Sequence, residues 1–198
     1  MTLNLPIARS YLRGHGIDLA LVGTVVVWAA MGFTRTVVDL PSLRAVAPVQ
    51  VSVDLVLPAL AAVLVCIATR EPVPAVSVTS PRGRSFLRLC RISAVAAVAV
   101  LPALLLAEHP DVTIPRFLFL TAICLMGVRL LGGGAAWIAP AAYFVTATLV
   151  GNNRDGTFES WAWVLATTQS LTSTLVAIGS FVAAALWWSL QQPERDRW

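Results

Sequence analysis

The feature that most constrains this fold is the recurrence of apolar runs long enough to cross a lipid bilayer. A helix needs about 20 residues to span the hydrocarbon layer. Six segments approach that length, at 17–38, 48–69, 86–107, 114–131, 137–150 and 161–190. Hydrophobic residues make up 58% of the chain and charged residues only 12%, which is too little charge to cover a soluble core. The sequence therefore predicts an all-α, polytopic membrane protein with six transmembrane helices.

The apolar stretch from 114 to 150 is too long for one span and is interrupted by Gly132, Gly133 and Gly134. Consecutive glycines favour a turn, so a helical hairpin is predicted there. No hydrophilic stretch is long enough to form a second domain. Residues 1–198 are therefore expected to form a single transmembrane domain, with a six-helix bundle at 17–190 and a cytoplasmic tail at 191–198.

The first 16 residues precede the first apolar run and carry their own pattern. One helix face can hold Leu5, Ala8, Tyr11 and Leu12, with Arg9 and Arg13 on another. This pattern is typical of an interfacial helix. The other interpretation is a tail whose arginines serve only to fix the topology.

Arginine supplies all the positive side-chain charge, with fourteen arginines and no lysine. Cytoplasmic loops of membrane proteins carry an excess of such residues. With a cytoplasmic N-terminus and six spans, ten of the fourteen lie on the cytoplasmic side: Arg9, Arg13, Arg70, Arg82, Arg84, Arg88, Arg91, Arg129, Arg195 and Arg197. Both termini are therefore predicted to be cytoplasmic.

The formal net charge of +4 is explained by this bias, so the expected partner surface is the lipid bilayer and not nucleic acid. The preference for Arg, Ala, Val and Gly is typical of a GC-rich bacterial genome. The predicted location is the bacterial plasma membrane, crossed several times.

Groups that could support catalysis are scarce. His15 and His109 fall on opposite sides of the membrane in this topology, so they cannot pair as haem or metal ligands. The sequence has no nucleophile elbow, nucleotide-binding loop or zinc-protease motif. Three cysteines in or beside apolar runs do not indicate a disulfide framework. We therefore predict no enzyme activity, no cofactor and no metal site.

The most charged piece of the chain is the segment between the second and third runs. Ser80 followed by Pro81 is a helix-start pattern. A helix from there would place Arg84, Arg88 and Arg91 in one basic stripe, with Arg82 close by. This stripe either fixes topology against anionic headgroups or docks a cytoplasmic partner.

One acidic residue falls inside a predicted span. Asp54 lies about six residues into the second run, or roughly 9 Å along a helix. A charge at that depth needs a partner or water. The arginines available on the outer side are Arg35, Arg44, Arg116 and Arg154. The simpler alternative is that the helix begins later and Asp54 is solvated.

The last apolar run, at 161–190, is longer than one span requires. A polar loop at 151–160 precedes it, followed by Trp161 and Trp163, residues that favour the membrane interface. A short outer helix at 161–169, followed by a separate sixth span from Ser170, would account for the excess length. We expect that outer segment to be re-entrant, with outer-gate candidates Asn153, Asp155, Trp161 and Trp163.

The start of this run is also unusually polar. Gln169 and Thr172 are intramembrane polar candidates together with Asp54. In the alternative interpretation, the hydroxyl and amide groups serve to hold neighbouring helices together.

The chain resembles the membrane subunit of a bacterial type-2 ABC exporter. The resemblance is carried by the six spans, the basic linker, and the segment WIAPAAYFVTATLV at 137–150 with the following GNNRDG loop and the Trp161, Trp163 pair. It implies a permease that forms the substrate path as a dimer with itself or a sibling permease. It also implies that separate cytoplasmic ABC ATPase subunits drive transport and dock at Arg82, Arg84, Arg88 and Arg91.

A function of another class also fits this sequence. A non-transporting accessory or assembly subunit would bind other membrane spans through its small and hydroxyl residues. The two hypotheses differ in whether an ATPase binds the chain.

Overall fold

The computed structural model describes residues 17–31, 33, 37–40, 43, 49–52, 55–67, 84–153, 157–166 and 169–190. The predicted interfacial helix at 1–16 and the tail at 191–198 lie outside the described residues, as do Asp54, Ser80, Pro81, Arg82 and Asp155. The elements in chain order are α2 (Ile17–Met31), β1 (Val37–Leu40), β2 (Val49–Ser52), α3 (Leu57–Ile67), α5 (Arg84–Leu106), α6 (Pro110–Leu131), η2 (Gly133–Ala135), α7 (Ile138–Val150), η3 (Ser160–Leu165) and α8 (Leu171–Ser189).

Each of the six predicted runs contains one α-helix, so the all-α prediction is confirmed at the level of fold class. Three helical segments are long and apolar enough to cross a membrane: Arg88–Leu106, Pro110–Leu131 and Leu171–Ser189, of 19, 22 and 19 residues. Helices α2, α3 and α7 have 15, 11 and 13 residues, fewer than the roughly 20 that span the hydrocarbon. Three helices of membrane length are therefore established, and the six membrane crossings stay a prediction.

The first two helices are shorter than predicted because parts of those runs form a β-hairpin. Strands β1 and β2 pair antiparallel, with Val37 opposite Ser52 and Leu40 opposite Val49. Both strands are rich in valine, whose branched side chain suits a strand. A short apolar run has no periodicity that separates such a strand from helix. The hairpin was therefore not predicted.

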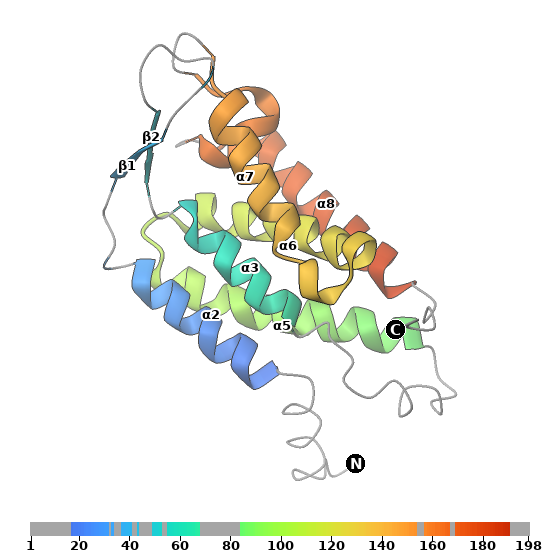
Figure 1. Ribbon diagram of the computed structural model, residues 1–198. Helices are drawn as coiled ribbons and strands as arrows, with labels where there is room; N and C mark the ends of the chain where they lie inside the picture. Colours follow the sequence, from blue (N-terminus) through green and yellow to red (C-terminus); the bar gives the residue numbers. More distant parts are fainter. Residues whose placement is uncertain are drawn as a thin grey trace.

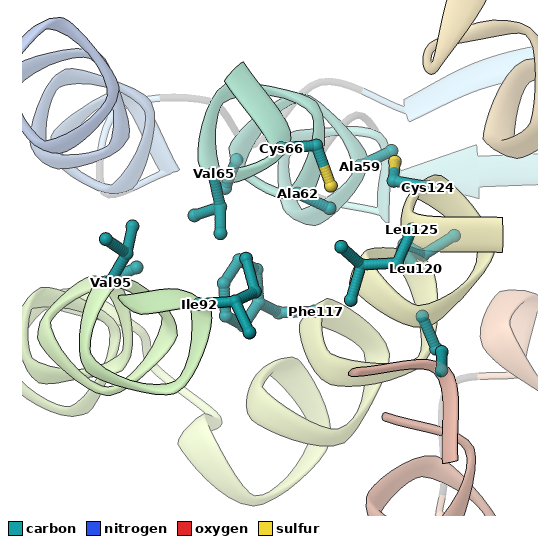
Figure 2. Packing of buried hydrophobic residues seen from close by; sticks show 14 of the residues in the cluster. Ala59, Ala62, Val65, Cys66, Ile92, Val95, Phe117, Leu120, Cys124 and Leu125 are labelled. Carbon is teal, nitrogen blue, oxygen red and sulfur yellow. The ribbon is translucent and has the colours of Figure 1, made fainter. Parts of the chain in front are cut away.

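Helix α6 lies at the centre of the bundle and packs against α3, α5, α7 and α8. Figure 1 shows α5 and α6 lying side by side, with α2 and α3 on one flank and α7 and α8 on the other. Figure 2 shows Phe117 of α6, Ile92 of α5 and Val65 of α3 within one buried cluster. Trp28 of α2 touches Phe117 edge-on at 5.8 Å and donates its indole N–H to the Ala99 carbonyl of α5 at 2.9 Å. One buried cluster thus joins α2, α3, α5, α6 and α8.

Large apolar side chains remain exposed around this core. Leu105 is 84% exposed and Leu171 is 77% exposed, and both belong to helices of membrane length. A soluble protein seldom leaves so much apolar surface uncovered, whereas hydrocarbon is the natural solvent for such a surface. The exposed faces of α5 and α8 therefore fit contact with lipid tails.

The two ends of the bundle carry opposite charge. The start of α5 and the last turns of α6 and α8 lie together, and we call this the basic end (Figure 1). The opposite end, formed by the hairpin, the start of α6, the end of α7 and η3, we call the acidic end. Among the described residues, the basic end holds Arg84, Arg88, Arg91 and Arg129, and the acidic end holds Asp39, Glu108, Asp111 and Glu159. Asp18, at the start of α2, and Arg116, near the start of α6, are the exceptions.

Candidate functional site

The final apolar run is broken at the acidic end. Ala166, directly after η3, has an extended backbone with φ −70° and ψ 138°. Ser170 then caps α8: its hydroxyl accepts from the Ser173 N–H at 3.1 Å, and its own N–H donates to the Ser173 hydroxyl at 3.1 Å. This reciprocal capping fixes the start of a new helix. The predicted break before a separate helix from about Ser170 is therefore confirmed, although the segment before it is a 3-10 helix.

Arg116 of α6 contacts the chain at this break. It is in the second turn of α6 and only 6% exposed, and its guanidinium donates to the Ala166 carbonyl. Its Nε is buried and has no hydrogen-bond partner among the described residues. From the sequence, Arg116 is a topological charge on the outer side and one candidate partner of Asp54. Its burial was not predicted, because nothing in the local sequence indicates that Ala166 contacts it.

Two amide side chains at the same end also have buried atoms without hydrogen bonds. Gln169 follows Ala166 by three residues, and neither its amide oxygen nor its amide nitrogen has a partner in the part of the chain that the structure describes. Asn152, 1% exposed, donates to the Thr148 carbonyl at 3.3 Å, but its Oδ1 is left without a partner there. Gln169 was a predicted polar candidate, whereas Asn152 was missed.

An aromatic group surrounds η3. Phe119 of α6 lies 5.0 Å from Trp163 and 5.6 Å from Tyr143 of α7, measured between ring centroids. Tyr143 lies 6.4 Å from Trp161 and donates its hydroxyl to the Trp161 carbonyl at 2.8 Å. Trp161 is 40% exposed, whereas Trp163 is half-buried. Of the predicted interface pair, only Trp161 is therefore well exposed.

The loop before η3 folds back onto the end of α7. Asn153 donates two hydrogen bonds to Thr157, from its backbone N–H to the Thr157 carbonyl at 2.8 Å and from its side-chain amide to the Thr157 hydroxyl at 3.3 Å. A Cβ at Gly151 would collide with the Ala147 carbonyl and with Ala162. Glycine is therefore required where η3 crosses α7. The remaining outer-gate candidate, Asp155, lies outside the described residues.

The two other predicted polar residues are Thr172 and Asp54. Thr172 is exposed on the first turn of α8, and Asp54 lies outside the described residues. Thr172 is thus not one of the buried intramembrane polar groups. The acidic end instead gathers Arg116, Asn152 and Gln169, three side chains that each hold a buried polar atom without a hydrogen bond to the described residues.

At the basic end, the predicted arginine stripe faces α8. Arg88 and Arg91 each place the guanidinium carbon 5.8 Å from the ring centre of Trp188. Arg129 lies 4.3 Å over Trp187 and donates to its backbone carbonyl. The shared face of Arg88 and Arg91 is confirmed, and their aromatic partner was missed. Arg84 is at the first position of α5, and its side chain lies outside the description.

The acidic-end group offers side-chain groups that suit the recognition of anions. A guanidinium and a carboxamide are hydrogen-bond donors that suit oxyanions. Within the described residues, no group of three His, Cys, Asp or Glu residues has the geometry of a metal site. Comparison of the chain with family models, curated proteins and solved structures found no match.

Proposed function

We propose that this chain is the membrane-spanning permease subunit of an ATP-driven exporter of the type-2 ABC class. The observation that supports it best is the interruption of the last apolar run: η3 and the extended Ala166 lie between α7 and α8 at the acidic end. An outer helical excursion before the last span is what the resemblance to this family implies. In the proposal, this excursion is re-entrant and closes the substrate exit, with Asn153, Asp155, Trp161 and Trp163 as gate residues.

The proposed topology has six spans with both termini in the cytoplasm of a bacterial cell. Consecutive helices of the hairpins α5–α6 and α6–α7 run in opposite directions, joined by short connections at 107–109 and 132–137. The charge difference between the two ends supports a cytoplasmic basic end. Helices α3 and α7 are shorter than the hydrocarbon layer is thick, but both pack against the long α6. In the proposal, neighbouring protein therefore fills part of the membrane thickness beyond their ends. Two copies, or one copy and a sibling permease, would form the path.

Energy for transport is assigned to a separate cytoplasmic ATPase. Its proposed docking surface is the start of α5, where Arg84, Arg88 and Arg91 recur on one face, together with Arg82. Arg84, Arg88 and Arg91 stand at the basic end, the side proposed to be cytoplasmic.

A second function is favoured by the same residues. Because Arg88 and Arg91 both lie over Trp188, the stripe already has a role inside the chain. Such a stripe needs no external partner. A non-transporting accessory or assembly subunit, which stabilises a larger membrane complex without an ATPase, is therefore the alternative.

Copurification separates the two. The tagged chain is expressed in its own host, extracted in mild detergent, and the eluate is examined for an ABC ATPase by mass spectrometry and for vanadate-sensitive ATP hydrolysis. We expect an ATPase with the native chain and none after the paired change Arg84→Glu and Arg88→Glu. Arg129→Glu makes the same kind of charge change at the same end but off the stripe, so it serves as the matched control and should keep the ATPase.

Absence of any ATPase from the native complex would favour the accessory subunit. An ATPase that stays bound to the Arg84→Glu, Arg88→Glu chain would show that the stripe only sets topology, and the docking surface would have to be sought elsewhere.

A further inference from the structure

Arg116 carries a charge that the described residues do not neutralise. A guanidinium stays protonated at any physiological pH, and enclosing it in protein costs several kcal/mol unless a counter-charge is present. The side chain is 6% exposed, and one of its five N–H groups donates a hydrogen bond to the Ala166 carbonyl. Its buried Nε has no partner among the described residues. A neutral carbonyl satisfies a donor but leaves the net charge in place.

The position of Arg116 suits a headgroup-level anion. It lies six residues after Pro110, the first residue of α6, or about 9 Å along the helix axis. The polar layers of a bilayer begin within a few ångströms of that depth if α6 starts at the water boundary. The positive pole of the α6 N-terminus adds to the attraction for a negative group. The amide nitrogen of Gln169 is a second buried donor with no partner within the described part of the chain. Gln169 lies three residues after Ala166, whose carbonyl Arg116 contacts.

We propose that the acidic end contains an oxyanion site in which Arg116 binds a single phosphate group and the Gln169 amide donates to it. The phosphate belongs either to the headgroup of an anionic phospholipid or to a free phosphate ion. Two donors of a guanidinium fork match two oxygens of such a group. This site is independent of whether an ATPase binds the chain, and it explains why a permanent cation is enclosed beneath the broken helix.

The test uses the full chain, purified in neutral detergent and stripped of lipid. Native mass spectrometry counts bound phosphatidylglycerol, with phosphatidylcholine as the zwitterionic comparison, and thermal unfolding is followed by circular dichroism with each lipid or with sodium phosphate. We expect one phosphatidylglycerol or one phosphate per chain and a rise in the unfolding temperature. Competition by sodium phosphate identifies a free-phosphate site, whereas phosphatidylglycerol binding that phosphate does not displace identifies a headgroup site.

Two variants and one control localise the site. Arg116→Gln should weaken binding about tenfold or more, since hydrogen bonds to charged groups are worth about 1.5–3 kcal/mol. Gln169→Leu leaves the arginine in place, and it should fold and bind several-fold more weakly, which keeps the test decisive if Arg116→Gln fails to fold. Arg129→Gln removes an arginine from the basic end and should bind as the native chain does.

The proposal is overturned if phosphatidylglycerol and phosphate bind no better than phosphatidylcholine, or if Arg129→Gln loses as much affinity as the Gln169 and Arg116 variants. It is also overturned if Asp54→Asn or Asp155→Asn destabilises the lipid-free chain while no anion binds. In that case, the counter-charge comes from the chain itself.

Discussion

At the basic end, Arg88, Arg91 and Arg129 lie over the tryptophan rings of α8, whereas at the acidic end Arg116 is enclosed and donates to a backbone carbonyl. Tryptophan faces attract cations without removing them from water, and both residue types favour the membrane interface. An enclosed guanidinium has no such access to water. The three basic-end arginines thus each have an aromatic partner, whereas the partner of Arg116 among the described residues is a neutral carbonyl.

The largest effect is expected at the basic end, from Trp188→Ala. Trp188 is 4% exposed and carries both Arg88 and Arg91 over its ring. Tryptophan truncation in soluble cores costs about 3–5 kcal/mol. Because lipid removes much of the transfer contribution, we expect a loss of about 3 kcal/mol in the free energy of unfolding, measured in mixed micelles by circular dichroism.

The adjacent Trp187 is the matched control, since it is 39% exposed and its ring lies under one arginine, Arg129, among the described residues. Trp187→Ala should cost about 1 kcal/mol, the size of an exposed cation–π contact. Equal losses at the two positions would mean that burial and the double arginine contact do not distinguish them.

At the acidic end, Gly151→Ala should disturb the crossing of η3 over α7. The added methyl group would collide with the Ala147 carbonyl and with Ala162, and overpacking of this kind costs about 1–3 kcal/mol. At Gly179 of α8, an added methyl group would meet no atom within 4 Å. Gly179→Ala should therefore be neutral or stabilising by up to about 1 kcal/mol. If both variants unfold like the native chain, η3 is not held against α7 as described.

A smaller effect is expected where the last run is broken. Ser170→Ala removes the hydroxyl that caps α8, and loss of such a cap costs about 1 kcal/mol. Thr172→Ala changes an exposed hydroxyl on the first turn and should cost less. Faster amide hydrogen exchange at 171–174 in the Ser170 variant, and not in the Thr172 variant, would be the direct signature. Unchanged exchange in both would argue for a helix that continues through Ser170.

The helical parts of the fold were predictable because long apolar runs leave few alternatives in a bilayer. The break before α8 was also predictable, since 161–190 exceeds one membrane thickness and Ser170 is a capping residue. The hairpin was not, because the valines of 37–40 and 49–52 extend the apolar runs without marking where helix gives way to strand.

The site was predicted less completely than the fold. Gln169 was singled out by its polarity within an apolar run. The burial of Arg116 depends on a contact with Ala166, fifty residues later, and the partner of Arg88 and Arg91 is about a hundred residues away in sequence at Trp188. No local pattern reports such distant contacts.

The orientation of the two ends is tested most directly by cysteine labelling. In a chain with Cys66, Cys90 and Cys124 replaced by alanine, Asp111→Cys places a thiol at the acidic end and Gly134→Cys places one at the basic end. Asp111 is exposed, and Gly134 is exposed with no atom within 4 Å of a side-chain position. With an impermeant maleimide on intact cells, we predict labelling of the Asp111→Cys chain and none of the Gly134→Cys chain until the membrane is permeabilised. Labelling of the Gly134→Cys chain alone, or of both chains in intact cells, would contradict a cytoplasmic basic end.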